Sequence, residues 1–219
     1  MEKEKNPNHP KGYKFFRGVL GPIFKFYYHP TVLNKEVIPE EGPILLVGNH
    51  KHIMDQCSIV ISTKRVINYM AKKEYFDNKK VAWFFKMSGC ISVDRQNHGG
   101  DSKEIALEVL ENGGAIGLFP EGTRIKTKEK LMLDFKFGTV SMAQKTGATI
   151  VPYGITGDYK FRSKNLMVRF GKPFKVGPKE DLEKANKKLY KEIESLLLEN
   201  LKATNRTVEE EKQSHMEES

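Results

Sequence analysis

Cysteine and long apolar runs are both scarce in this sequence of 219 residues. Cys57 and Cys90 are its only cysteines, and the polar start has no apolar stretch followed by a small-residue cleavage site. The simplest interpretation is a reduced, cytoplasmic chain without a secretory signal. No run of about 18 apolar residues occurs, so a simple transmembrane helix is not expected.

Acidic residues are also in the minority. The chain has 37 Lys and Arg against 28 Asp and Glu, a formal net charge of +9, which favours anionic partners. Nucleic acid, anionic lipid and phosphorylated substrates all qualify, so charge alone does not choose among them. The length fits one domain with a substantial core, and a hydrophobic fraction of 38% is ordinary for a globular protein.

The first thirty residues divide into two parts. Residues 1–10 are predicted to be a disordered lead, whereas residues 11–30 predict an amphipathic helical segment that Gly21-Pro22 kinks or breaks. Basic residues alternate there with apolar residues at helical spacing, which are Phe15, Phe16, Val19, Leu20, Ile23, Phe24, Phe26 and Tyr27. Such a segment suits the interface of an anionic membrane. The alternative is a helix packed on the protein's own core.

Beyond residue 30, short apolar stretches alternate with segments of helical periodicity. Strands are predicted at residues 43–48, 65–71, 90–94, 115–119, 149–155 and 166–170. Helices are predicted at residues 54–63, 75–87, 102–110, 139–145 and 181–202. This alternation is typical of an α/β fold with a mostly parallel central sheet flanked by helices. We assign residues 31–203 to this domain and expect a disordered tail at the polar residues 204–219.

The first polar constellation directly follows the strand predicted at residues 43–48. Its His50 and Asp55 would face apart on one continuous helix, since five residues rotate the chain by about 140° net. They can meet only if His50 lies in the turn and Asp55 in the first turns of the helix. Asp55 would then hold one ring nitrogen and leave the other as a general base.

Three other interpretations of this segment stay open. His50, His52 and Asp55 could form a metal site, because both histidines lie on one turn. The segment could be a helix N-terminus with incidental polar residues. Cys57 could be a nucleophile beside His50 and Asp55, although a small buried Cys is commoner.

The second constellation is the sequence FPEGTR at residues 119–124, again directly after a strand. Gly122 lets the backbone turn tightly and present amide groups to an anion. Arg124 has a planar fork suited to a phosphate, and Thr123 offers a hydroxyl. Glu121 could orient Arg124 or accept a hydrogen bond from a polyol. The alternative is a plain turn with a structural Glu–Arg pair.

Two more cations follow predicted strands. Lys72 comes directly after the strand at 65–71, and Arg95 directly after the strand at 90–94. Each alone is typical of a solvated loop. Together with Arg124 they place positive charge at the carboxyl ends of three strands, where α/β proteins bind ligands. This convergence suits an anionic substrate.

These segments resemble those of a known family, the 1-acyl-sn-glycerol-3-phosphate acyltransferases. The pattern NHxxxxD at residues 49–55 resembles the first family motif, GCISVDR at 89–95 the second, FPEGTR at 119–124 the third and IVPYG at 150–154 the fourth. The sequence FKFGT at 135–139 is similar to the stretch after the third motif. An HxxxxD match alone is weak, whereas four motifs in the same order are specific.

The resemblance implies a role for each matched residue. His50 would be the general base and Asp55 its orienting partner, with no acyl-enzyme intermediate. The substrate phosphate would be bound by Lys72, Arg95 and Arg124. The remaining matched residues are the turn of the acceptor site, Glu121, Gly122 and Thr123, and a structural or acyl-lining strand with Val151 and Pro152. Neither a metal nor a cofactor is implied.

The resemblance also implies substrates and a location. The donor would be an acyl thioester, either acyl-CoA or acyl carrier protein, and the acceptor the sn-2 hydroxyl of lysophosphatidic acid, giving phosphatidic acid in phospholipid biosynthesis. The enzyme would be peripheral, on the cytoplasmic side of the cell membrane, with an anionic membrane surface and no nucleic acid as partner. The chain departs from the family at Ile125, where many relatives have Ser, and at the unusually basic Lys51 and His52. These departures bear on the acceptor rather than on the reaction type.

Two other functions belong to different classes. A metal-dependent hydrolase would use His50, His52 and Asp55, and chelators would abolish its activity. A non-catalytic lipid-binding protein would keep the same fold, but the intact His50 and Asp55 argue against it.

Overall fold

The computed structural model describes residues 11–94 and 100–217, whose strands form a seven-stranded sheet. The strand order is β1-β7-β6-β2-β5-β3-β4. The strands are β1 (Thr31–Leu33), β2 (Ile44–Gly48), β3 (Ile67–Lys72), β4 (Ile91–Val93), β5 (Ala115–Leu118), β6 (Thr149–Thr156) and β7 (Met167–Phe170). Neighbouring strands are parallel except β6 and β7, so the predicted mostly parallel sheet is confirmed.

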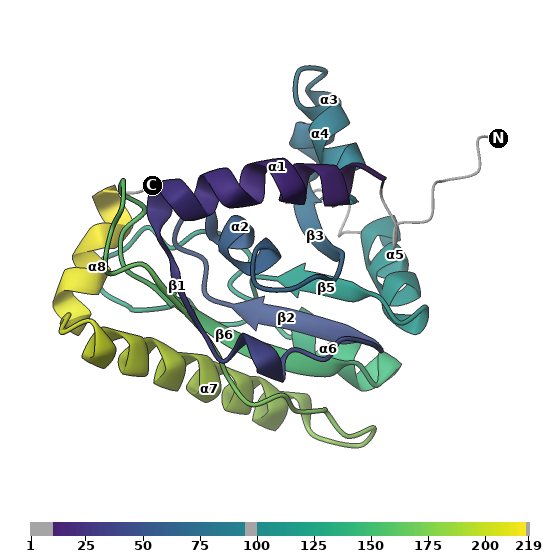
Figure 1. The fold of residues 1–219 in the computed structure, drawn as a ribbon. Helices are drawn as coiled ribbons and strands as arrows, with labels where there is room; N and C mark the ends of the chain where they lie inside the picture. The colour runs from purple at the N-terminus through teal and green to yellow at the C-terminus, as the bar shows by residue number, and fades with distance from the viewer. Residues whose placement is uncertain (1–10, 95–99, 218–219) are drawn as a thin grey trace.

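Helices cover both faces of this sheet (Figure 1). Helices α1 and α2 pack on one face, and α5, α6 and α7 on the other. The helices are α1 (Lys11–Tyr28), α2 (Asp55–Val60), α3 (Lys73–Asp77), α4 (Ala82–Met87), α5 (Gly100–Glu111), α6 (Gly138–Thr146), α7 (Leu182–Ala203) and α8 (Val208–Glu217), with a short 3-10 turn η1 (Lys35–Val37).

Strand β2 lies at the centre of the sheet and is buried along its whole length. Its side chains alternate between two cores: Ile44 and Leu46 join the core beneath α1 and α2, while Leu45 and Val47 join the core beneath α5, α6 and α7. A strand covered on both faces needs a continuous apolar run. The burial of β2 on both faces therefore explains the apolar run at residues 43–48 of the sequence.

The carboxyl ends of β2, β5 and β3 open at the same edge of the sheet, because these parallel strands are neighbours. Val47 lies opposite Leu118, and Tyr69 lies opposite Gly117. The turns after β2 and β5 therefore start side by side. They carry the two polar constellations.

Helix α1 runs through Pro22, so of the kink or break predicted at Gly21-Pro22 the break does not occur. One face packs on the protein, with Tyr13 and Phe24 buried and Gly21 against Ile61. The other face is exposed yet apolar, and its residues are Phe15, Val19, Leu20, Ile23, Phe26 and Tyr27. The same helix thus packs on the core and presents apolar side chains to solvent. Residues 1–10, predicted to be disordered, lie outside the described residues.

The prediction of a disordered tail from residue 204 is wrong for residues 208–217, which form α8. The helix begins with a capping box: Thr207 Oγ1 accepts the N–H of Glu210 at 3.2 Å, and Glu210 Oε2 accepts the N–H of Thr207 at 2.7 Å. Glu211, Ser214 and His215 are buried. The polar composition suggested disorder because the residues that α8 buries are themselves polar. The sequence pattern T-x-x-E was the signal that could have identified the helix.

Candidate active site

The side chains of His50 and Asp55 meet at the end of β2. His50 Nδ1 lies 2.8 Å from Asp55 Oδ2. His50 is in the turn and Asp55 is the first residue of α2, which is the arrangement that the sequence required for contact. The His50 side chain is 17% exposed and that of Asp55 is fully buried. A substrate can therefore reach the imidazole but not the carboxylate.

Further donors hold the Asp55 carboxylate in place. Oδ2 accepts the backbone N–H groups of Lys51 and His52, and Oδ1 accepts the Tyr159 hydroxyl, each at 2.8 Å. Because an ionised carboxylate only accepts, His50 Nδ1 must carry the hydrogen in its contact with Asp55. Nε2 is then the ring nitrogen that can take up a proton.

The backbone of His50 is bonded to the loop after β5. Its N–H donates to Glu121 Oε1 at 2.7 Å, and its carbonyl accepts the N–H of Ile125 at 2.8 Å. The other Glu121 oxygen accepts the N–H of Leu133 at 2.7 Å. The turn with His50 and the loop with Arg124 therefore form one connected unit.

The structure gives Glu121 a role different from the two expected. Glu121 was predicted to orient Arg124 or to accept a hydrogen bond from a polyol, but both its oxygens are occupied by backbone donors. The side chain is only 4% exposed. Burial raises the pKa of Glu121 to about 7, although the two N–H donors act in the opposite direction. Glu121 thus links the His50 turn to the segment with Leu133 from a buried position.

Asn49 and Phe119 have roles that the sequence did not reveal, although both lie in the matched motifs. The Asn49 amide pairs with the backbone of Ile155, donating at 2.9 Å and accepting at 2.8 Å, so it continues the β2–β6 pairing past the strand end. The Phe119 ring stacks on the His50 imidazole, with centroids 3.9 Å apart and planes 11° apart. These contacts fix the position of the turn and the plane of the His50 imidazole.

The structure relates the predicted cations to this unit to different degrees. Arg124 is half-buried beside Thr123, which is exposed, and Lys72 is exposed at the end of β3. The Arg124 loop is bonded directly to the His50 turn through Ile125. Arg95 lies outside the described residues. Of the predicted cations, Arg124 is therefore the one whose loop the structure ties to His50.

Lys136 was not predicted as a site residue, yet it lies over the turn of the third motif. Gly122 has a φ of +74°, and a Cβ there would be 2.9 Å from Lys136 Nζ. Glycine meets both demands, the left-handed backbone and the close approach of the lysine. Its place in the sequence FKFGT was the available signal. Lys136 adds a further ammonium group beside the loop that carries Arg124.

The structure does not favour the metal and cysteine interpretations. His52 Nδ1 accepts the N–H of Met54 at 3.1 Å, and its ring stacks on Tyr159. Within residues 11–94 and 100–217, no three His, Cys, Asp or Glu side chains are grouped as metal ligands. Burial, with a smaller effect of Asp55, raises the pKa of Cys57 to about 11, so its thiol is protonated at neutral pH.

Val151 and Pro152 lie in β6 and are buried. Val151 joins the core beneath α1 and α2, and Pro152 lies opposite Val47 of β2. Of the two roles expected for this strand, this placement favours the structural one.

Comparisons with known proteins identify the family of this chain. The family model for acyltransferases matches residues 29–156, more than half of the chain. This chain belongs to the acyltransferase family. Among relatives of this acyltransferase, the 1-acyl-sn-glycerol-3-phosphate acyltransferase of Bacillus subtilis is 34% identical over 146 residues, covering 66% of this chain and 71% of the relative. The protein of the same name from Borreliella burgdorferi is 30% identical over 142 residues, covering 64% of this chain and 56% of the relative.

A solved structure also resembles this acyltransferase. The crystal structure of the 1-acyl-sn-glycerophosphate (LPA) acyltransferase PlsC from Thermotoga maritima matches with a TM-score of 0.67 and 25% identity. The match covers 87% of this chain and 82% of that chain. The α/β architecture is therefore shared over most of both proteins.

The raised pKa of Glu121 predicts a pH-dependent stability effect. Since folding raises this pKa from 4.5 to about 7, the contribution of Glu121 is fully present below pH 4.5 and is lost as the pH rises through 7. Glu121→Gln stays neutral throughout. We compare the free energy of unfolding of Glu121→Gln with that of the wild type. The difference, variant minus wild type, should rise by about 2–3 kcal/mol between pH 5 and pH 8.

Urea denaturation of both proteins at each pH measures this difference. All other titrating groups are common to the two chains, so the difference isolates position 121. A difference that stays constant from pH 5 to 8 would contradict the assignment.

Proposed function

We propose that this protein transfers a fatty acyl group from an acyl thioester to the sn-2 hydroxyl of lysophosphatidic acid, giving phosphatidic acid. The observation that carries the proposal is the His50–Asp55 pair, with the His50 backbone bonded to the loop that bears Arg124. A base beside a cation suits an acceptor with a hydroxyl near a phosphate. The names of the relatives from Bacillus subtilis and Borreliella burgdorferi support the same acceptor.

The reaction follows from the arrangement of the base. His50 Nε2 takes the proton of the acceptor hydroxyl as the oxygen attacks the thioester carbonyl carbon. The tetrahedral intermediate collapses, the carbon–sulfur bond breaks, and the proton passes from His50 to the leaving thiolate. Asp55 keeps the imidazole in the correct tautomer and stabilises the imidazolium formed on the way. No acyl-enzyme intermediate is needed.

The acceptor phosphate would be held by the cations at the carboxyl edge of the sheet. Arg124 supplies a planar fork from the His50-bonded loop, and Lys72 and Lys136 supply ammonium groups. Arg95 completes the set that the family resemblance implies. Gly122 and Thr123 form the turn beside Arg124 and Lys136.

The acyl donor is a co-substrate, and no cofactor is required. Acyl-CoA and acyl carrier protein are both anionic, and a chain with a net charge of +9 attracts either one. The proposal is therefore a thioester donor of these two kinds.

The lipid-facing patch is our term for the exposed apolar residues of α1 with Trp83 of α4 and Phe161. Phe16 contacts Trp83 at 5.8 Å between ring centroids, and Tyr27 contacts Phe161 at 5.1 Å, so the patch extends beyond α1. Lys14 and Lys25 are exposed on the same helix. An apolar patch with basic residues suits the interface of an anionic membrane.

Aromatic contacts connect this patch to the active site. The ring centroid of Tyr28, at the end of α1, lies 5.5 Å from that of Tyr159, and the Tyr159 hydroxyl donates a hydrogen bond to Asp55. In the described part of the chain, none of the helices combines the length and apolar character that a membrane crossing needs. We therefore propose peripheral binding at the cytoplasmic side of the cell membrane, with α1 lying in the interface and the His50 turn near the headgroups.

Replacing the proposed base should abolish most activity. His50→Ala should lower kcat by about 100-fold or more, and Asp55→Asn should also be severe. His29→Ala is a matched control, because His29 is exposed on the loop after α1. The measurement is phosphatidic acid formation with lipid products identified by mass. Near-normal turnover by folded His50→Ala would rule out this mechanism.

Removing the half-buried guanidinium should weaken acceptor binding through the phosphate. Arg124→Ala should lose about 1.5–3 kcal/mol of acceptor binding, measured as a rise in KM for lysophosphatidic acid. The loss should shrink for monoacylglycerol, which has no phosphate. Lys126→Ala, an exposed cation two residues further on, serves as the control. Equal losses with both acceptors would place Arg124 outside the phosphate site.

The lipid-facing patch should govern vesicle binding. The triple change of Phe15, Ile23 and Phe26 to Ser alters exposed side chains and spares the buried Phe24, so the protein should fold but sediment poorly with anionic vesicles. Leu198→Ser is the control, because Leu198 is equally an exposed apolar residue but lies on α7, on the opposite face. Undiminished sedimentation of the folded triple variant would show that the binding surface lies elsewhere.

A further inference from the structure

Lys51, which follows the catalytic base directly, is fully buried and reaches the C-terminal helix. Its ammonium donates to Glu211 Oε1 at 2.7 Å and to Ser214 Oγ at 3.2 Å, both on α8, and to the carbonyl of Gly157. The Glu211 side chain is 1% exposed. The basic residue that departs from the family pattern is therefore half of a buried ion pair across 160 residues of sequence.

Helix α8 also contacts the other two segments of the site. Glu211 Oε2 accepts the N–H of Gly157 at 3.1 Å, two residues before Tyr159. His215 Nδ1 lies 3.3 Å from the carbonyl of Thr127, three residues after Arg124. One helix thus touches the turn of the base, the loop of Tyr159 and the loop of Arg124.

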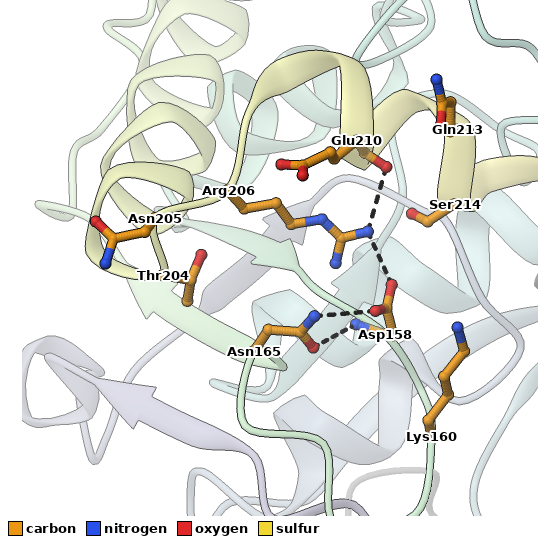
Figure 2. Close-up of a pocket in the computed structure, with 9 residues that line it drawn as sticks. All are labelled: Asp158, Lys160, Asn165, Thr204, Asn205, Arg206, Glu210, Gln213 and Ser214. Carbon is orange, nitrogen blue, oxygen red and sulfur yellow. Dashed lines mark hydrogen bonds and ion pairs between the residues drawn. The ribbon is translucent and has the colours of Figure 1, made fainter.

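Ion pairs hold the start of α8 against the loop between β6 and β7. Figure 2 shows Arg206 extended from the α7–α8 connection toward Asp158, with which it pairs at 2.9 Å, while Asn165 donates to the same carboxylate. Arg206 Nε also lies 3.3 Å from Glu211 Oε2. Arg206, Asp158 and Asn165 line a polar cavity of about 420 Å³, and its lining residues lie outside the four family motifs. The contacts fix where α8 sits.

The contacts of α8 lead directly to the catalytic pair. The Lys51 side chain is anchored by α8, and the Lys51 N–H is one of the donors that hold Asp55 Oδ2. The Gly157 backbone is anchored by α8 as well, and it precedes Tyr159, which holds Asp55 Oδ1. Both oxygens of the orienting carboxylate therefore depend on segments that Glu211 braces.

We infer that Lys51 and Glu211 are positioning residues for acyl transfer, and that α8 holds the catalytic turn in its active geometry through their buried ion pair. The inference rests on the proposed role of His50 as the base. A buried ammonium without its partner carries a large desolvation cost, so the pair is satisfied only when α8 is docked in this one position. Such a pair specifies the position of α8 on the domain and adds little to the free energy of unfolding.

Glu211→Gln tests this inference, because it removes the charge while keeping the side-chain size. Glu209→Gln is the matched control on the same helix, since Glu209 is exposed and its ion pair with Lys212 lies within α8. We expect Glu211→Gln to lower kcat about 10- to 100-fold with little change in the KM for the acceptor, because a displaced base slows the chemical step more than binding. Glu209→Gln should match the wild type in both constants.

A second readout does not need the reaction. Hydrogen–deuterium exchange of peptides covering residues 49–59 and 157–160 should rise in Glu211→Gln and stay at the wild-type level in Glu209→Gln, while the peptide covering β2 remains protected. If the wild type does not acylate lysophosphatidic acid, the proposed function fails, and the exchange data still decide whether α8 braces the turn.

The double variant Lys51→Met with Glu211→Met separates the unpaired charge from other effects. Replacing a buried pair by apolar side chains of similar size commonly preserves the packing. It should restore the protection of residues 49–59 and recover at least about tenfold in kcat over Glu211→Gln, within the range that residues supporting a site from outside contribute. Exchange at residues 157–160 should stay high, because the hydrogen bond from the Gly157 N–H to Glu211 is lost in this variant as well. The double variant also serves as the test protein if Glu211→Gln does not fold.

Three results would overturn the inference. They are unchanged kcat in folded Glu211→Gln, a fall in kcat without increased exchange at residues 49–59, and a double variant whose exchange at residues 49–59 is as high as that of Glu211→Gln. The first would detach α8 from catalysis. The second and third would show that the loss does not arise from release of the catalytic turn.

Discussion

The Asp55 carboxylate is the point on which the geometry of this site depends. It is fully buried and takes hydrogen bonds from the His50 ring, from two backbone N–H groups of its own turn and from the Tyr159 hydroxyl. A buried carboxylate is stable in its charged form only with several well-placed donors, so each donor is held at a defined position in return. The pairing of Asp55 with His50 is therefore a property of the surrounding fold as much as of two residues in the sequence.

The donors come from segments that are far apart in the chain, and each segment is itself anchored. Glu121 and Ile125 hold the backbone of His50 on the loop after β5. Asn49 ties the start of the turn to β6. Because each of these hydrogen bonds involves a backbone group of the sheet or its loops, the anchors tolerate little displacement, and they keep the imidazole in one plane against Phe119. The parallel sheet contributes by opening the ends of β2 and β5 side by side.

Two helices connect this site to the rest of the molecule in different ways. Helix α1 packs through Phe24 and Tyr28 against Tyr159 and leaves an apolar face exposed, which relates the position of the site to the proposed membrane surface. Helix α8 reaches the same site from the C-terminal end through Lys51 and Gly157. The burial of charged residues beneath α8 is compatible with folding because Lys51, Glu211, Arg206 and Asp158 form paired contacts.

The sequence by itself determined the alternation of strands and helices, the mostly parallel sheet and the condition under which His50 and Asp55 can meet. These follow from local rules: continuous apolar runs for buried strands, helical periodicity, and the five-residue spacing that excludes a single helix. The sequence did not determine the role of Glu121, the stacking of Phe119, the place of Lys136 over Gly122 or the helix at residues 208–217. These depend on partners that are distant in the chain, and polar residues buried against distant partners look the same in sequence as polar residues in solvent. Only the tertiary structure, by bringing Glu211 to Lys51, decided which of these charges lie inside the protein.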